Sequence, residues 1–131
     1  MSGPIKEVAE ILSPESLTVE ENLPGDGQTY PKDGDICLIQ YTASFESNGE
    51  QFDSSHDHSQ TGEFEFIVGK NEVIRGLNDG IQQMTTGARA TITMSSSLAY
   101  GYSGVPGLIP ANADLVFEVW LIAVNGCKNM V

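Results

Sequence analysis

The sequence predicts one α+β domain in which a mostly antiparallel sheet packs its apolar face against a single short helix. Three observations support this fold class. Segments with alternating apolar residues recur along the chain, one segment has helical spacing, and 131 residues suffice for one domain of ordinary size. No internal repeat appears, and no linker divides the chain.

The chain opens with an extension, residues 1–15, ahead of a domain at 16–125 and a C-terminal tail at 126–131. In the extension, apolar residues recur at steps of three and four, which predicts a short amphipathic helix. These residues are Ile5, Val8, Ile11 and Leu12. An isolated helix of this length is marginal in water, so it needs the body of the domain to pack against.

Two strands are predicted in the first third of the domain. Leu17 and Val19 alternate with polar residues and indicate the first strand, which a turn at residues 24–27 follows. Residues 36–46 form the second. Asn48-Gly49 then predicts a tight hairpin turn, because both residues tolerate positive φ. The second strand places five residues on one face: Cys37, Ile39, Tyr41, Ala43 and Phe45.

Three further strands and the helix follow. Residues 64–68 and 90–94 alternate, whereas residues 115–124 are apolar on both faces at several positions, which is typical of a central strand. The helix is indicated by one apolar stripe, Ile74, Leu77, Ile81 and Met84. Gly76 and Gly80 leave one side of it bare, so a sheet can approach closely. Trp120 alternates with its neighbours and should point away from the core, either beneath the N-terminal helix or into an exposed interface.

The charge balance excludes several partners. Six basic against eighteen acidic residues give a formal charge of −12, which disfavours nucleic acid and anionic membrane surfaces. No apolar run is long enough to cross a bilayer, and the charged first 25 residues lack the apolar core of a signal peptide. We therefore expect a cytoplasmic protein.

No familiar catalytic or metal-binding set is present. The sequence has no phosphate-binding glycine motif, no nucleophile elbow and no Cys/His spacing typical of a metal site. His56-Asp57-His58 is the densest group of metal-ligating side chains, but it lies on a polar loop. We expect no metal and no cofactor.

Aromatic residues from separate segments either form part of the core or converge on one concave apolar face. They are Tyr41, Phe45, Phe52, Phe64, Phe66, Tyr100 and Phe117. Asp53 follows Phe52 beside this set and needs a donor such as the Tyr41 hydroxyl. Residues 99–110 form a long loop rich in glycine and proline, and long ordered loops in compact domains are often functional.

These motifs together resemble the FKBP family of peptidyl-prolyl isomerases, the immunophilins that bind tacrolimus and rapamycin. The resemblance runs from about residue 16 to 125, in order and with nearly the family's spacing. The segments that carry it are Tyr41-Thr42, Phe52-Asp53-Ser54-Ser55, residues 69–76, Ala99-Tyr100-Gly101, residues 106–110 and residues 115–119.

The resemblance implies an antiparallel half-barrel of five or six strands around the short helix, with a pocket between helix and sheet. Its substrate- and macrolide-binding residues would be Tyr41, Phe52, Asp53, Phe64, Val73, Ile74, Leu77, Tyr100, Ile109 and Phe117. Tyr41, Asp53 and Tyr100 are the candidate catalytic residues. The Ile74 N–H and the Tyr100 hydroxyl would bind ligand carbonyls.

The expected activity is cis-trans isomerisation of X–Pro bonds in proline-containing peptides and proteins, by a monomer. Two departures from the family pattern affect this expectation. Leu77 stands where many members have tryptophan, which predicts weaker activity and keeps open an alternative, a weakly active or non-catalytic binding module. His58 stands where arginine is common, so its protonation could hold Asp53 and Tyr41. Val105 and Leu108 lie on the loop that meets protein partners in the family.

Overall fold

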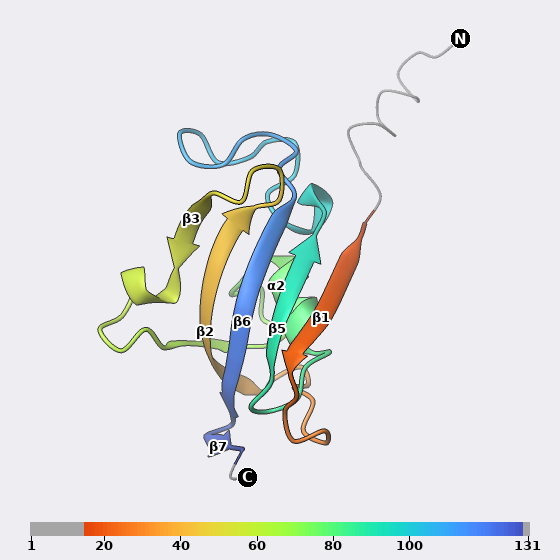
Figure 1. Ribbon diagram of the computed structural model, residues 1–131, viewed down its shortest axis with the longest axis vertical. Coiled ribbons are helices and arrows are strands. Elements are labelled where there is room, and N and C mark those ends of the chain that lie inside the picture. Colours follow the sequence, from red (N-terminus) through yellow and green to blue (C-terminus); the bar gives the residue numbers. More distant parts are fainter. Residues whose placement is uncertain (1–14, 130–131) are drawn as a thin grey trace.

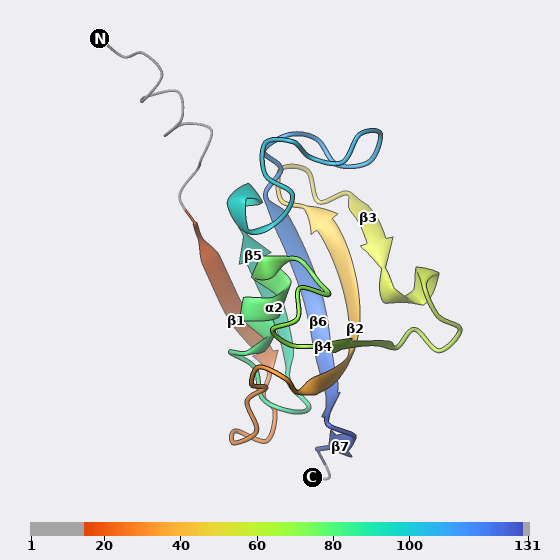
Figure 2. The same cartoon turned by 180° about the vertical axis from the view of Figure 1, so that it is seen from behind.

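The computed structural model describes residues 15–129, in which one sheet wraps around a short helix (Figure 1, Figure 2). The predicted helix at residues 1–15 therefore lies almost wholly outside the described residues. The elements are β1 (Leu17–Leu23), β2 (Ile36–Phe45), β3 (Gln51–Ser54), η1 (Ser55–Asp57), β4 (Phe64–Ile67), α2 (Arg75–Ile81), β5 (Arg89–Met94), η2 (Ser96–Leu98), β6 (Leu115–Val124) and β7 (Cys127–Lys128).

The sheet is antiparallel throughout its described strands. Its order is β1-β5-β6-β2-β3, and β4 also pairs with β2 while the two-residue β7 pairs with β6. The α+β prediction, with a sheet around one helix, is confirmed. β6 is the middle strand of the order, as its two-sided apolar pattern predicted.

The core lies between the helix and the inner face of the sheet. Alternate residues of β2 are buried, and β6 presents Phe117 and Val119 to the same side as Tyr41, with which Val119 is in register. Outward residues such as Glu118 are exposed. Residues two apart on a strand share a face, so this alternation fixes which side chains can reach the helix.

The close approach of α2 to the sheet depends on its two glycines. A Cβ added at Gly80 would lie 2.8 Å from Cδ1 and Cγ2 of Ile92, and one at Gly76 would lie 2.9 Å from Cβ of Met94. Real side chains do not tolerate such distances without a shift of the neighbour. The bare side of the helix that the sequence predicted is therefore the side that faces β5.

The helix is shorter than its apolar stripe. Ile74 is the N-cap, and α2 ends at Ile81, so Met84 lies beyond the helix although it is only 1% exposed. The N–H groups of Gln83 and Met84 donate to the carbonyl oxygens of Gly80 and Ile81 at 3.0 Å. These tight turns keep the chain coiled after the helix, so the stripe continues into the core without an α-helical backbone.

The connection after β2 differs from the predicted tight turn. Asn48 does not adopt positive φ; only Gly49 does, at 74°. The Phe45 N–H donates to the Glu50 carbonyl at 3.0 Å, which makes a longer loop, and the Asn48 side chain accepts from the Glu50 N–H at 2.8 Å. The loop leads into β3, which the sequence did not predict as a strand.

A long loop between η2 and β6 runs along one end of the sheet (Figure 1). Val105 and Ile109 exchange two backbone hydrogen bonds of 2.8 Å within it, which ties its tip together. Among residues 15–129, the structure contains no helix of the length and apolar character needed to span a bilayer.

Candidate active site

Three aromatic rings from three strands meet on the inner face of the sheet. The ring of Tyr41 on β2 lies edge-on to Phe64 of β4 at 5.8 Å between centroids, and tilted against Phe117 of β6 at 5.6 Å. Such edge-to-face and tilted contacts are the favoured geometries of aromatic pairs. The register of β2 with β4 and β6 therefore builds a rigid aromatic cluster.

Leu77 of the helix lies in the core to which this cluster belongs. Leu77 is 3% exposed and belongs to the same contiguous core as Tyr41 and Phe117. Partly buried residues pack against that core around it: Phe52, Phe64, Val73 and Ile74. Buried and half-buried apolar residues therefore lie together in this part of the molecule.

The N-terminus of α2 carries a backbone N–H group, that of Ile74, without a hydrogen-bond partner within residues 15–129. Ile74 has extended backbone, and its carbonyl accepts from the N–H groups of Leu77 at 3.1 Å and Asn78 at 3.0 Å. Its own N–H donates to no acceptor within residues 15–129. The first N–H groups at a helix start lack intrahelical partners, so they are free to bind a carbonyl group.

A hydrogen-bonded carboxylate lies beside the aromatic cluster. The Tyr41 hydroxyl donates to Oδ2 of Asp53 at 3.0 Å, and Nε2 of His58 lies 2.8 Å from Oδ1. The Ser54 N–H also donates to Oδ1 at 2.8 Å. The sequence expected the Tyr41–Asp53 contact, and the structure confirms it.

Burial and the Asp53 carboxylate raise the pKa of the Tyr41 hydroxyl above its ordinary value, burial being the larger cause. Burial, followed by the charge of Asp53, likewise raises the pKa of Tyr100. Both phenols therefore stay protonated at neutral pH and remain hydrogen-bond donors.

Ser55 holds the backbone of Tyr41 in place. Its hydroxyl is fully buried, accepts from the Tyr41 N–H at 3.0 Å and donates to the Tyr41 carbonyl at 3.3 Å. β3 pairs with β2 at residues 42–44 and β4 pairs at residues 36–39, so the serine fills the gap between them. Sequence reasoning missed this role, since nothing in the local pattern names a backbone partner 14 residues away.

The remaining predicted residues lie around this centre with different degrees of burial. Tyr100 is 38% exposed; the charge of Asp53 acts on it, and Tyr100 in turn acts electrostatically on Tyr41. Ile109 is 5% exposed but lies outside the contiguous core. Phe52 stacks on Phe45 at 4.6 Å between centroids. On the outer part of the loop Leu108 is 56% exposed.

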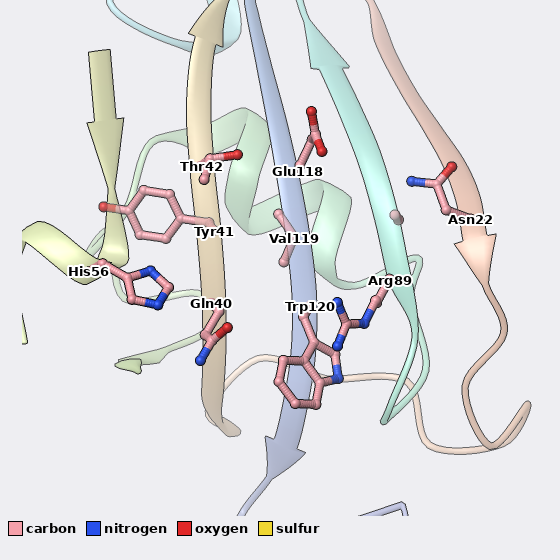
Figure 3. Close-up of a pocket in the computed structure, with 10 residues that line it drawn as sticks. Asn22, Gln40, Tyr41, Thr42, His56, Arg89, Glu118, Val119 and Trp120 are labelled. Carbon is pink, nitrogen blue, oxygen red and sulfur yellow. The ribbon is translucent and has the colours of Figure 1, made fainter. Parts of the chain in front are cut away.

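A hollow of about 270 Å³ lies on the outer face of the sheet (Figure 3), and Tyr41 is the one member of the aromatic cluster among the residues that line it. Trp120 lines it, with the guanidinium of Arg89 4.3 Å from its ring centroid. Trp120 therefore points away from the core, as its position in β6 predicted. His56 also lines this hollow, whereas His58 contacts Asp53, so the two histidines do not form one site. Among the described residues, no three His, Cys, Asp or Glu side chains are grouped to hold a metal.

Comparison with known proteins identifies relatives across most of the chain. Residues 27–122 match the family model described as FKBP-type peptidyl-prolyl cis-trans isomerase. The chain is 45% identical over 109 residues to FK506-binding protein 1 of Yarrowia lipolytica, which covers 83% of this chain and 98% of that protein. It is 48% identical, with the same coverage, to peptidyl-prolyl cis-trans isomerase FKBP1A of Xenopus laevis.

Proposed function

The chain belongs to the FKBP-type peptidyl-prolyl cis-trans isomerase family, and from this membership we propose that X–Pro bonds rotate against its aromatic cluster. The observation that carries the proposal is the meeting of Tyr41, Phe64 and Phe117, in one core with Leu77 and with the Tyr41–Asp53 hydrogen bond beside it. An apolar face and a few fixed donors suit this reaction.

The reaction needs no nucleophile and no metal. Rotation about a peptide bond faces a barrier of about 18–20 kcal/mol because amide resonance must be broken. The cis and trans forms of X–Pro differ by only about 0.5–1 kcal/mol, so the obstacle is kinetic. A thousandfold acceleration requires about 4 kcal/mol of tighter binding to the twisted amide than to the planar one.

Each residue has a proposed role in that differential binding. Phe52, Phe64 and Phe117 would enclose the proline ring and exclude water, above a floor of Leu77. A twisted amide is less dipolar than a planar one, so an apolar surrounding disfavours it less. Val73 and Ile109 would complete the walls around the ring.

Polar groups would fix the rest of the substrate. The free Ile74 N–H and the protonated Tyr100 hydroxyl would donate to carbonyl oxygens on either side of the twisting bond. Tyr41 and Asp53 would hold the edge of the site through their hydrogen bond. We count Tyr41, Asp53 and Tyr100 as the catalytic residues of this proposal.

The same surface is the proposed binding site for macrolides of the tacrolimus and rapamycin type, as membership of the family implies. Val105 and the exposed Leu108 would contact a protein partner on the adjoining loop. We further propose a domain spanning residues 16–125, a monomeric state and a cytosolic location. Light scattering on the purified chain tests the monomeric state.

A weakly active or non-catalytic binding module is the second candidate. Leu77 favours it, because a leucine presents less flat surface to a proline ring than an indole does. The two candidates differ in turnover, whereas both predict binding of proline-containing ligands.

Exchange NMR on an X–Pro tetrapeptide measures turnover without a coupled protease. We expect saturable catalysis that one equivalent of tacrolimus abolishes. Phe64→Leu should lower kcat/KM about tenfold or more, while Trp120→Phe on the outer face should leave it unchanged. Tacrolimus binding without catalysis would favour the binding module, and equal loss in both variants would contradict the assigned site.

A further inference from the structure

The chain that precedes β1 leaves the domain from a point that is held by two sets of contacts. The Ser16 N–H donates to the Ser95 hydroxyl at 2.9 Å, and the Ser16 carbonyl accepts from the Ser95 N–H at 2.9 Å. The two terminal nitrogens of the Arg75 guanidinium donate to the two carboxylate oxygens of Glu15, at 2.6 and 3.1 Å. This bidentate arrangement fixes direction as well as distance between an arginine and a carboxylate.

Both groups that hold this exit point lie close in the chain to the polar groups of the proposed site. Arg75 is the first residue of α2 and directly follows Ile74, whose N–H is the first proposed donor. Ser95 lies five residues before Tyr100, whose hydroxyl is the second. Figure 2 shows the start of β1 at the same end of the sheet as η2 and the long loop. The preceding residues therefore join the domain beside the segments that carry both donors.

Residues 1–14 lie outside the described part of the chain, and their sequence contains two X–Pro bonds, Gly3–Pro4 and Ser13–Pro14. The two bonds differ in reach. Pro14 directly precedes Glu15, so its Cα is limited to about 3.8 Å from that of the ion-paired residue. Pro4 precedes Glu15 by eleven residues. A chain of that length spans about 17 Å as a helix and about 36 Å when extended, while a small domain is about 30 Å across. The first bond can therefore reach the aromatic cluster, and the second cannot.

We infer that the Gly3–Pro4 bond of the chain's own N-terminal segment is an intramolecular substrate of the isomerase site. This inference rests on the proposed function of the aromatic cluster. The Pro4 ring would occupy the place proposed for the proline of a peptide substrate, and the carbonyls beside it would accept from the Ile74 N–H and the Tyr100 hydroxyl. Rotation about the bond breaks amide resonance only, so the reaction needs no further reactant.

The covalent connection compensates for the weak contacts of this substrate. The glycine before the proline has no side chain to bury, so a Gly–Pro unit in free solution would bind weakly. A short connecting chain gives the attached group an effective concentration of about 1 mM. For a unit with a Kd of about 1 mM, the site is then occupied for about half of the time. Competing ligands would bind about twofold more weakly, and the site stays open to other substrates.

The full chain contains both the bond to be tested and its control. Exchange NMR on chain labelled with ¹³C at proline measures the cis-trans exchange rate of each bond. Uncatalysed X–Pro exchange takes tens to hundreds of seconds at 25 °C, on the order of 10–100 s or more. We expect Gly3–Pro4 to exchange about a hundredfold faster or more, and Ser13–Pro14 to exchange at the uncatalysed rate. One equivalent of tacrolimus should return the Gly3–Pro4 rate to the uncatalysed value.

Two variants test the competition between this bond and external ligands. Pro4→Ala removes the intramolecular substrate, so the tacrolimus Kd should fall about twofold and kcat/KM for an external X–Pro peptide should rise about twofold. Pro14→Ala is the matched control and should change neither value. The Gly3–Pro4 exchange rate of the parent chain should stay constant over a tenfold range of protein concentration, because the substrate and the site belong to one molecule.

Uncatalysed exchange of Gly3–Pro4 in a chain that isomerises an external peptide would overturn the inference and leave the proposed function intact. An exchange rate that rises with protein concentration would also overturn it, since the site would then act on a second copy of the chain. Equal acceleration of Gly3–Pro4 and Ser13–Pro14 would contradict the argument from reach. Absence of catalysis on the external peptide by the parent chain and by Pro4→Ala would instead overturn the proposed isomerase site, and this inference with it.

Discussion

The size of the Leu77 side chain determines how much apolar surface the base of the proposed site offers to a proline ring. This side chain is 3% exposed, and Leu77 belongs to the same core cluster as Tyr41 and Phe117. A leucine covers less area than the larger aromatic residues that can occupy such a position. Binding of a proline ring is therefore expected to depend more on the surrounding aromatic residues than on Leu77.

Replacing Leu77 with tryptophan should strengthen binding. The added flat surface would contact the ring of a proline or a macrolide, and burial of apolar area contributes about 25 cal/mol per Å². We expect the tacrolimus Kd to fall about five- to tenfold, equivalent to about 1–1.4 kcal/mol, with a rise in kcat/KM. Isothermal calorimetry and exchange NMR measure the two effects.

The melting temperature of Leu77→Trp provides the control, because an oversized side chain in the core is destabilising. A folded variant of unchanged stability that gains neither affinity nor activity would contradict the placement of Leu77 under the ligand.

At the residue scale, the sequence predicted the site residues that lie in a recognisable motif. It did not predict the role of a side chain that hydrogen-bonds to backbone groups of a distant residue. The aromatic residues and Asp53 lie in short motifs, so their meeting followed from the resemblance. Ser55 lies in the same motif, but its partners are the N–H and C=O of Tyr41. No composition or spacing rule indicates which backbone groups a hydroxyl will satisfy.

At the element scale, the break between β3 and β4 makes Ser55 a structural necessity. Replacing Ser55 with alanine leaves the N–H and C=O of Tyr41 without partners in a buried position, which costs about 2–3 kcal/mol. Urea unfolding should show this loss, and the isomerase activity of the folded fraction should fall because Tyr41 is less well fixed. Ser47→Ala in the exposed hairpin loop should change stability by less than about 0.5 kcal/mol. Equal stability of the two variants would refute the role given to Ser55.

The contact between α2 and β5 gives a second element-scale prediction. Gly80→Ala improves helix propensity by about 1 kcal/mol, but its Cβ would overlap the branched side chain of Ile92. Overpacking of this kind costs about 1–3 kcal/mol, so we expect a net loss of about 1 kcal/mol and reduced activity as the helix shifts. Thermal and urea unfolding measure the loss.

Ile92→Ala in the Gly80→Ala background tests whether overlap with the Ile92 side chain causes this loss of stability. The double variant should be more stable than the sum of the two single changes predicts, by at least about 0.5 kcal/mol. Strict additivity would mean that the helix does not rest on Ile92.

Elements whose apolar residues recur at a regular spacing were predictable from the sequence. Elements that form only by pairing with a neighbouring strand were not. The alternation in β2 and β6 and the stripe of α2 follow from burial on one side. β3 has only four residues, and its register with β2 shifts between Ala43 and Ser44, so it shows no period of its own. The loop before it widens because only Gly49, not Asn48, takes positive φ.

At the scale of the whole molecule, the sheet separates two surfaces of different character. The inner face holds the core, the helix and the proposed site, whereas the outer face presents Trp120, Arg89 and polar residues (Figure 3). A charge of −12 is spread over a chain with six basic residues. Within residues 15–129, Arg75 forms ion pairs with Glu15 and Asp79, and His58 lies 2.8 Å from Asp53, so most carboxylates have no cationic partner nearby.

This excess of negative charge predicts that salt stabilises the fold. The Debye length falls from about 20 Å to about 6 Å between 20 and 300 mM NaCl, which screens repulsion among exposed carboxylates. Repulsion acts over the whole compact surface, while the few ion pairs that salt also weakens are exposed and contribute little. We expect the melting temperature to rise by about 3–6 °C over this range.

The double variant Glu20→Gln/Glu21→Gln is the matched test of that cause. Both residues are exposed on the edge strand β1 and take part in none of these contacts, and their neutralisation changes the formal charge from −12 to −10. The variant should melt higher than the parent chain at 20 mM NaCl and gain less from added salt, because less repulsion is left to screen. A melting temperature that falls with salt would instead mean that ion pairs such as Arg75–Glu15 outweigh the repulsion. Isomerase activity toward an uncharged peptide should stay constant across the series, since apolar contact rather than long-range charge binds that substrate.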